Sequence, residues 1–527
     1  MYDVLFQNVT LVDGTGAPRK QADLAIEGGR IAAIAEPGGV SAREARELVP
    51  GEGLILTPGF IDIHSHSDTT IFAYPQAESR ILQGVTTELT GNCGISAAPV
   101  SQDPALRKML LDYVGDLPYT WQTVGQFLQA LEETRPSVNL GFAVGHGTLR
   151  IAAMGFDDRE PTEAEMETME RLLDQALADG AYAMSSGLIY PPGCYCQTKE
   201  LLQLAKHLPA YGAFYCTHMR NEREKLVESV QEAIVIARGA GAALQISHHK
   251  ALYKPNWQKL CFQSTALIEG ARAEGLDVLC DQYPYIATAT SLDSNVPNWA
   301  FAGGVEALLA RLQDPETRAK LRAETNESHR GRWQDICVSY VKSEKNKWVQ
   351  GKSLLEIARI QGKDPADACF DLLIEEKCRA GEVNTSMCEE DVEYIMAKPY
   401  VMTGSDGNAF SMDYDGQPHP RAFGTFPRVI AHYSRDRGLF PLEEAIRKMT
   451  TLPASRLGLT DRGSLKPGAW ADLVLLDLDK LEDTPTYAAP MAPCQGIRRV
   501  YVNGVLAAQD GVHTGARAGQ VLRHSKG

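Results

Sequence analysis

Both ends of the chain carry short apolar runs with the length and patterning of β-strands. The run at residues 23–34 contains Gly28-Gly29, as a hairpin would, and Asn503-Gly504 marks a second hairpin near the C-terminus. We therefore expect one small β-sandwich domain that is assembled from residues 1–57 and 456–527. The strand-like runs lie at residues 4–12, 23–34, 472–477 and 500–507.

The middle of the chain, residues 58–455, alternates helical periodicity with short apolar runs. Strand-helix alternation over this length predicts a (β/α)8 barrel of the TIM type. An open doubly wound sheet is the rival, but no Gly-rich phosphate loop opens a helix after a strand. The paired helix and strand segments are residues 161–180 with 181–184, 222–241 with 243–247, and 263–275 with 277–281.

Residues 300–395 are more polar and show helical periodicity without clear strands. We interpret them as a helical segment inserted beside the barrel rather than a domain of its own. The sequence contains no internal repeat and no low-complexity tract.

Composition restricts the function without identifying it. The chain has 527 residues, of which 44% are hydrophobic, enough for a barrel and a smaller domain. Its formal net charge of -15 argues against nucleic acid or an anionic membrane as a partner. Eleven scattered cysteines do not form a disulfide framework, and no signal peptide or membrane-spanning run is visible. We expect a soluble cytoplasmic protein that acts on a small molecule, and the sequence predicts no oligomeric state.

His64 and His66 follow an apolar strand that begins after Pro58-Gly59. Residues two apart on a strand share a face, so both imidazoles point the same way at the end of a barrel strand, where barrel active sites lie. An isolated His-x-His pair is more often a hydrogen-bonded strand end than a metal site.

Four further residues occupy equivalent positions, and each has an ordinary interpretation by itself. Cys93 lies between glycines after a strand and could be a small buried hydrophobe. His218 and His248 each close an apolar strand, whereas His249 should point away. Asp406 follows a strand and could cap a helix. Taken together, four imidazoles, a thiolate and a carboxylate at strand ends of one barrel predict a zinc site, because all three groups are zinc ligands.

The motifs around these residues resemble the D-aminoacylase (N-acyl-D-amino-acid deacylase) family of the amidohydrolase superfamily. The resemblance covers nearly the whole chain. In chain order, the motifs that carry it are PGFIDIHSH, GNCG, SSGLIYPPG, THMRNE, QISHHK, GSDG, PHPRAFGTFPRV, TLPASRLGL and RGSLKPGAWADLVLLD.

The resemblance implies roles for individual residues. It implies a tightly bound zinc at Cys93, His218 and His248, with Cys93 in place of the carboxylated lysine of many amidohydrolases. It also implies a weaker second site, which can be empty, formed by His64, His66 and Asp406. Finally, it implies that Tyr190, Lys250 and Arg421 bind the substrate α-carboxylate, although Lys250 could equally be a surface lysine after a strand.

Hydrolysis of a linear amide is consistent with these residue types. Zinc lowers the pKa of a bound water to about 7, which supplies hydroxide at neutral pH. We expect Asp406 to act as general base towards the water and then as general acid towards the leaving amine. The D-configuration of the substrate is implied by the resemblance alone.

Two alternatives remain open on the sequence. A cyclic-amide hydrolase of the hydantoinase or dihydroorotase kind would share the metals, but should carry the bridging lysine and lack the carboxylate-binding set. A catalytically inactive barrel that serves as a binding scaffold should have lost metal ligands or the base.

The loop at residues 287–296 is expected to lie over the barrel mouth and to contribute to the pocket for the substrate side chain. It contains Asp293 and no basic residue. A carboxylate there would disfavour acidic substrates and favour cationic or neutral polar ones. Alternatively, Asp293 caps a turn and faces water, and Leu292, Val296 and Trp299 define an apolar pocket.

Overall fold

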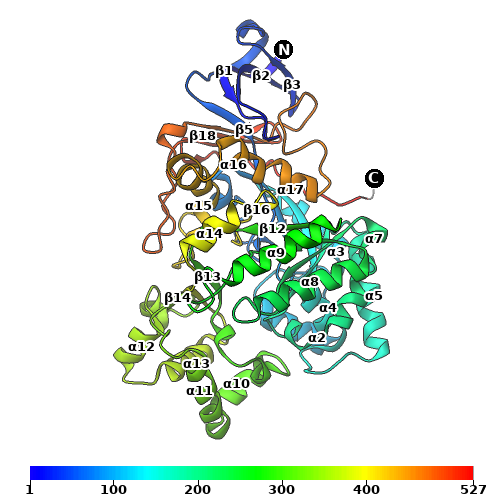
Figure 1. The fold of residues 1–527 in the computed structure, drawn as a ribbon, viewed down its shortest axis with the longest axis vertical. Helices are drawn as coiled ribbons and strands as arrows, with labels where there is room; N and C mark the ends of the chain where they lie inside the picture. Colours follow the sequence, from blue (N-terminus) through cyan, green and yellow to red (C-terminus); the bar gives the residue numbers. More distant parts are fainter. Residues whose placement is uncertain (526–527) are drawn as a thin grey trace.

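A parallel eight-stranded barrel forms the centre of the computed structural model, which describes residues 1–525. Every pair of neighbouring strands is parallel, and helices connect successive strands, as the alternating pattern predicts (Figure 1). The barrel strands are β6 (Phe60–Asp62), β7 (Val85–Thr90), β8 (Asn139–Gly145), β9 (Ala183–Gly187), β10 (Phe214–His218), β11 (Ala243–Ile246), β12 (Val278–Gln282) and β16 (Val401–Thr403).

Backbone hydrogen bonds beyond the ends of β6 and β16 close this barrel. The amide of Asp406 donates to the carbonyl of His64 at 2.8 Å, and the amide of His66 donates to the carbonyl of Gly407 at 2.8 Å. Ser65 and Gly407 form the corresponding parallel bridge. The first and last strands of the barrel therefore meet at the histidines and the aspartate that the sequence singles out.

The helices around the barrel begin and end where local sequence dictates. The helix predicted at residues 161–180 is α5, and Thr162 and Glu165 form a reciprocal capping box at its start. Gly241, in the left-handed conformation with φ of 68°, ends α8. The helices of the barrel region are α1 (Glu78–Ile81), α2 (Pro104–Val114), α3 (Val124–Thr134), α4 (His146–Met154), α5 (Glu163–Ala178), α6 (Thr198–Ala205), α7 (Leu208–Tyr211), α8 (Leu226–Ala240), α9 (Leu260–Ala273), α14 (Glu389–Met396), α15 (Arg421–Arg428), the π-helix Val429–Asp436, α16 (Leu442–Lys448) and α17 (Thr451–Arg456).

The two chain ends build one β domain, which confirms the prediction from their apolar runs. Its strands form a single nine-stranded sheet that folds around its own core, and a bridge between Arg30 of β3 and Trp470 joins β3 to the segment before β17. Phe6, Leu473 and Tyr501 are buried inside it. The strands are β1 (Tyr2–Leu11), β2 (Lys20–Glu27), β3 (Arg30–Ala35), β4 (Ala45–Pro50), β5 (Ile55–Pro58), β17 (Leu473–Leu476), β18 (Ile497–Val502), β19 (Val505–Gln509) and β20 (Val512–His513).

The inserted segment lies between β12 and β16, at the opposite end of the molecule from the β domain (Figure 1). Its helices are α10 (Val305–Gln313), α11 (Pro315–Ser328), α12 (Leu354–Gln361) and α13 (Pro365–Glu376).

The prediction that residues 300–395 lack strands is wrong. β14 (Ile336–Val341) and β15 (Ala380–Thr385) lie within them and form an antiparallel three-stranded sheet with β13 (Ala287–Ser291). The pattern hides β15 because two of its buried positions are the polar residues Glu382 and Asn384, so burial does not appear as an apolar alternation.

Within residues 1–525, none of the helices has the length and apolar character needed to cross a membrane. All of the cysteines are free thiols, which agrees with their scattered distribution in the sequence.

The C-terminal tail returns to the barrel at the amino ends of its strands. Val521 forms a parallel bridge with Leu140 of β8, and the amide of Gly519 donates to the carbonyl of Pro136 at 2.9 Å. A Cβ on Gly519 would lie 2.1 Å from the carbonyl oxygen of Val138, a backbone atom with little freedom to move. Only glycine fits this contact.

We therefore expect Gly519→Ala to loosen the tail and to lower the thermal unfolding midpoint by a few degrees, since such overpacking costs about 1–3 kcal/mol. Gly270→Ala in α9 is the matched control, because its Cβ meets nothing within 4 Å and alanine favours a helix. Thermal denaturation and limited proteolysis of the tail measure the effect. An unchanged midpoint with an equally protected tail would contradict the prediction.

Candidate metal centre

A cavity of about 770 Å³ opens at the carboxyl ends of the barrel strands. Its wall includes His66 after β6, Cys93 after β7, His218 at the end of β10, His248 after β11 and Asp406 after β16. Parallel strands in a barrel point their carboxyl ends to one face, so residues far apart in sequence converge there.

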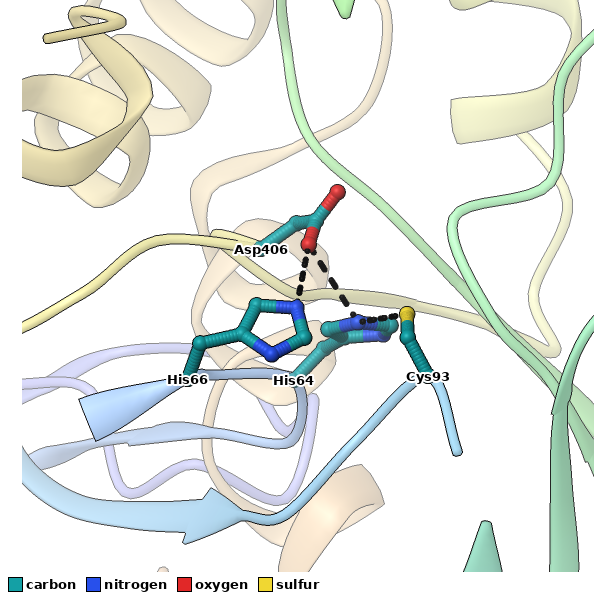
Figure 2. Close-up of side chains that lie close together, drawn as sticks. All are labelled: His64, His66, Cys93 and Asp406. Atoms are coloured by element: carbon teal, nitrogen blue, oxygen red, sulfur yellow. Dashed lines mark hydrogen bonds and ion pairs between the residues drawn. The ribbon is translucent and has the colours of Figure 1, made fainter. Parts of the chain in front are cut away.

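Two groups of possible metal ligands meet at Cys93. One consists of His64, His66, Cys93 and Asp406, and the other of Cys93, His218 and His248; within each group the ligand atoms lie within 4.8 Å of one another. Figure 2 shows the first group, in which an Asp406 oxygen lies 3.0 Å from His66 Nε2 and 3.4 Å from His64 Nε2. Cys93 Sγ lies 3.3 Å from His64 Nε2 and 3.4 Å from His248 Nε2, so the thiol stands between the two groups.

Three of these residues have left-handed backbone conformations, with φ of 54° at Cys93, 37° at His248 and 53° at Asp406. Such conformations are uncommon for residues other than glycine and cost free energy unless the surroundings hold them. The amide of His248 donates to an Asp281 oxygen at 2.8 Å, and the barrel-closing hydrogen bond holds Asp406. After Cys93, Gly94 also has a positive φ, and a Cβ there would lie 2.3 Å from the amide nitrogen of Gly187.

Asp281 is a functional residue that sequence reasoning missed, although it lies in a predicted strand. Its buried carboxylate contacts His64 Nδ1 at 3.0 Å and accepts hydrogen bonds from the His248 amide and the Gln245 side chain. A carboxylate on Nδ1 orients the imidazole so that Nε2 faces the centre, as the partners of metal-binding histidines do. Like the histidines, Asp281 lies near the carboxyl end of its strand, β12, and this position in the sequence could have identified it.

Glu222 is the second missed residue, although it ends the THMRNE segment. It is buried beside His248, with 3.0 Å between its carboxylate and Nδ1, and it pairs with Lys250 at 2.7 Å. Lys250 Nζ also lies 2.7 Å from His248 Nδ1, and the lysine is only 3% exposed. The interpretation of Lys250 as a surface lysine is therefore wrong.

His249 lies next to this network but points away from it, as predicted, with its Nε2 2.9 Å from Ser264 of α9.

The electrostatic environment favours anionic ligands at the centre. Burial would raise the pKa of the Cys93 thiol, but the charges of His64 and His248 hold this pKa well below its ordinary value. Burial also opposes ionisation of Asp406, but the Arg421 guanidinium 2.8 Å away and the neighbouring histidines together outweigh it, so the pKa of that carboxyl lies well below its usual range. The interpretation of Asp406 as an ordinary helix cap is wrong, since its carboxylate faces His66 and Arg421.

His218 provides a direct test of whether a metal fits. Its ring is 5% exposed, and neither ring nitrogen has a hydrogen-bond partner among the described residues. Burying an imidazole without partners costs free energy, because the lost hydrogen bonds to water are not replaced. A cation beside Cys93 and His248 would accept a ring nitrogen of His218 as a ligand. The residues present therefore fit a zinc ion held by one cysteine and two histidines.

The structure places the residues predicted to bind the substrate around the same cavity. Tyr190 stands edge-on to the His218 ring, with 5.0 Å between ring centroids, and its hydroxyl lies 3.0 Å from Thr290 Oγ1. Arg421 contacts Asp406 and donates to the carbonyl of Ala289 at 3.1 Å.

Asp293 lines the cavity, and the segment that carries it is strand β13 followed by a short 3-10 helix (Leu292–Asn295) rather than a loop. In the alternative, Leu292, Val296 and Trp299 would define the pocket. The structure does not support it: Leu292 and Val296 are buried in the hydrophobic core, and none of the three is among the described residues that line the cavity.

Comparisons with known proteins agree with this geometry. The sequence matches the model of the amidohydrolase family over residues 48–508. A D-aminoacylase from Alcaligenes xylosoxydans xylosoxydans is 38% identical over 522 residues, which are 99% of the chain and 97% of that protein.

Two solved structures extend the likeness to three dimensions. One is a D-aminoacylase described for its binuclear metal center, with a TM-score of 0.83, 37% identity, and coverage of 99% of the chain and 100% of that protein. The other is the N-acyl-D-glutamate deacylase of Bordetella bronchiseptica, complexed with zinc and a phosphonate inhibitor that mimics the tetrahedral intermediate. It has a TM-score of 0.83, 36% identity, and coverage of 99% of both chains.

Proposed function

The chain belongs to the amidohydrolase family, and from that premise we propose that it hydrolyses the amide bond of N-acyl-D-amino acids, with zinc as its cofactor. The position of Cys93 between the two ligand groups carries this proposal. In this proposal, Cys93, His218 and His248 bind one zinc tightly, and His64, His66 and Asp406 bind a second metal more weakly. Relatives named D-aminoacylase and N-acyl-D-glutamate deacylase support the substrate class.

Bound zinc would supply an activated water and would polarise the amide carbonyl at this site. The chain's own residues hold the ligands in place: Asp281 orients His64 and His248, and Glu222 fits the role of acceptor for a His248 Nδ1 proton.

Asp406 is the proposed proton shuttle. Its carboxylate stands at the centre but is also paired with Arg421 at 2.8 Å, which holds its pKa low and makes it a weak base. A substrate α-carboxylate that binds Arg421 would share the guanidinium and raise the proton affinity of Asp406. Binding of the correct substrate would thus prepare Asp406 to take the proton of the attacking water and deliver it to the leaving nitrogen.

Arg421, Tyr190 and Lys250 are the proposed groups that bind the α-carboxylate. The Arg421 guanidinium can bind a carboxylate through two nitrogens, and it is buried against the Tyr283 ring at 4.8 Å. Lys250 is paired with Glu222. We therefore assign it two roles towards the substrate α-carboxylate: attraction through its positive charge at a distance, and direct contact.

Neither alternative function is favoured by a specific observation. A hydantoinase-like or dihydroorotase-like enzyme is expected to carry a carboxylated lysine between its metals, and among residues 1–525 the side chain shared by the two groups is Cys93. An inactive scaffold should have lost ligands or the base, yet each proposed ligand and Asp406 face the centre.

The substrate class can be tested with N-acetyl-D-methionine, its L-enantiomer, its methyl ester and a panel of cyclic amides. We expect hydrolysis of the D-acid, with kcat/KM for the ester lower by about ten-fold or more, because a charge-assisted contact with Arg421 is lost. Equal kcat/KM for acid and ester would remove the proposed carboxylate contact. Turnover of the cyclic amides alone would replace the proposed function.

Cys93→Ala should lose bound zinc and activity together, because the thiolate is the ligand common to both groups. Metal content measured by mass spectrometry on purified protein checks this. Cys261→Ala in α9 is the matched control, a buried thiol outside both groups, and should retain its zinc. Undiminished zinc in Cys93→Ala would make the assignment wrong.

Asp406→Asn should retain the tightly bound zinc and lose kcat by about 10²–10⁴-fold, since an amide cannot shuttle the proton. Metal analysis and steady-state kinetics on the same preparation separate the two effects. If this variant instead loses the tight zinc and added metal restores its activity, Asp406 is a structural ligand rather than the shuttle.

A further inference from the structure

Strands β13 and β15 present a row of polar side chains to the cavity, beyond the metal centre. Thr290 pairs with Glu382 and Thr288 pairs with Asn384 across the antiparallel ladder. Residues directly opposite each other in such a pair have side chains on the same face of the sheet. All four line the cavity, so one face of this small sheet forms part of its wall.

This row is physically connected to the metal centre. The Thr290 hydroxyl lies 3.0 Å from the Tyr190 hydroxyl, and Tyr190 stands against His218. The carbonyl of Ala289, on the same strand, accepts a hydrogen bond from Arg421. A substrate held by Arg421 and Tyr190 therefore has β13 beside it, and its side chain can extend towards Glu382.

The titratable groups along this wall are carboxyl groups, Glu382 and Asp293. Glu382 is only 3% exposed, and its carboxylate accepts a hydrogen bond from the Asn295 side chain. Asp293 also lines the cavity, close enough to Glu382 for its charge to act on it. Burial foremost, with Asp293 adding to it and the charge of Arg223 opposing it, raises the pKa of Glu382 to about 8. Glu382 is therefore largely protonated at neutral pH, and a cation bound beside it would favour its ionised form.

Asn384 provides an independent observation that points to a ligand. Its side chain lines the cavity and is 6% exposed, and its Oδ1 has no hydrogen-bond partner among the described residues. Asn384 lies two residues from Glu382 and on the same face of β15. A buried acceptor beside a buried carboxylate is satisfied by a group that carries several N–H donors.

The cations of the cavity wall do not meet this need. The Arg223 guanidinium lies over the Tyr253 ring at 5.0 Å. Its charge acts on Glu382, but within residues 1–525 it forms no direct ion pair with Glu382 or Asp293. The remaining cations of the wall already have carboxylate partners: Arg220 with Glu232, Lys250 with Glu222, and Arg421 with Asp406.

We propose that Glu382, Asp293 and Asn384 form a subsite for a cationic substrate side chain, so that the preferred substrates are N-acyl-D-lysine and N-acyl-D-arginine. This inference rests on the proposed function and names its substrate class. An ammonium or guanidinium group would pair with the carboxylates and donate to the Asn384 oxygen. Substrates with an acidic side chain would meet like charge, so N-acyl-D-glutamate and N-acyl-D-aspartate should be poor.

The test compares N-acetyl-D-lysine with N-acetyl-D-norleucine, which has a side chain of similar length without the charge, and with N-acetyl-D-glutamate. In the wild type, kcat/KM for the lysine substrate should exceed that for norleucine by about ten-fold or more. Glu382→Gln should remove most of this preference by lowering kcat/KM for the lysine substrate. A thermal unfolding midpoint and zinc content equal to those of the wild type show that the variant is folded.

Two further variants and a control sharpen the result. Asp293→Asn and Asn384→Leu should each lower the preference for lysine over norleucine. Glu316→Gln, an exposed carboxylate of α11 outside the cavity, should leave the preference as it is in the wild type. A wild type that prefers norleucine or glutamate, or a lysine preference unchanged in Glu382→Gln, overturns the subsite.

A wrong proposed function would give a different result from a wrong subsite. If none of the three substrates is hydrolysed by the zinc-loaded enzyme, the activity is wrong, and calorimetry then judges the subsite separately. Binding of N-acetyl-D-lysine at least ten-fold tighter than N-acetyl-D-norleucine, lost in Glu382→Gln, would support a cation subsite in a protein with another reaction. Equal binding would refute the subsite.

Discussion

The closure of the barrel between β6 and β16 is the constraint on which the metal centre depends. The hydrogen bonds that join the ends of the sheet run between the backbones of His64 and Asp406 and of His66 and Gly407. The same short segments carry the two imidazoles and the carboxylate of one ligand group (Figure 2). The backbone contact that closes the fold therefore also sets the spacing of His64, His66 and Asp406, and opening the barrel there would separate this ligand group.

The centre is held together at a cost that its surroundings offset. Cys93, His248 and Asp406 all adopt left-handed backbone conformations, and the side chains around them bury several charges. Each charge has a partner nearby: Asp281 contacts His64, and Glu222 contacts Lys250 and His248. The His218 ring differs from these groups, since within the described chain neither of its nitrogens has a hydrogen-bond partner and Glu222 approaches Nε2 only to 3.6 Å. A metal ion would offset the cost of the strained backbone and would supply a partner for the His218 ring, so both features are consistent with a metal site.

Reaction chemistry and side-chain selectivity come from different parts of the chain. The centre is built from barrel strand ends, whereas the far wall of the cavity is built from β13 and β15, which belong to or adjoin the insertion after β12. Relatives with similar identity to this chain are named for unspecified and for acidic D-amino acids. Overall identity therefore does not decide the side chain, and the residues of this wall, Glu382 among them, are where selectivity is expected to reside.

Sequence alone determined the strand-helix alternation of the barrel, the β domain from both chain ends, and the candidate residues at strand ends, but not the strands β13, β14 and β15. These follow from local periodicity and from the position of a residue within its own strand, both of which can be read in a short window. Only the tertiary structure revealed Asp281 and Glu222 as partners of the histidines, and Glu382 and Asn384 as part of the cavity wall. Their roles depend on neighbours far away in sequence, and at β15 the polar residues occupy the buried positions, so the strand has no apolar alternation to detect. Burial of a polar group is decided by what packs against it, and that information is absent from any single segment.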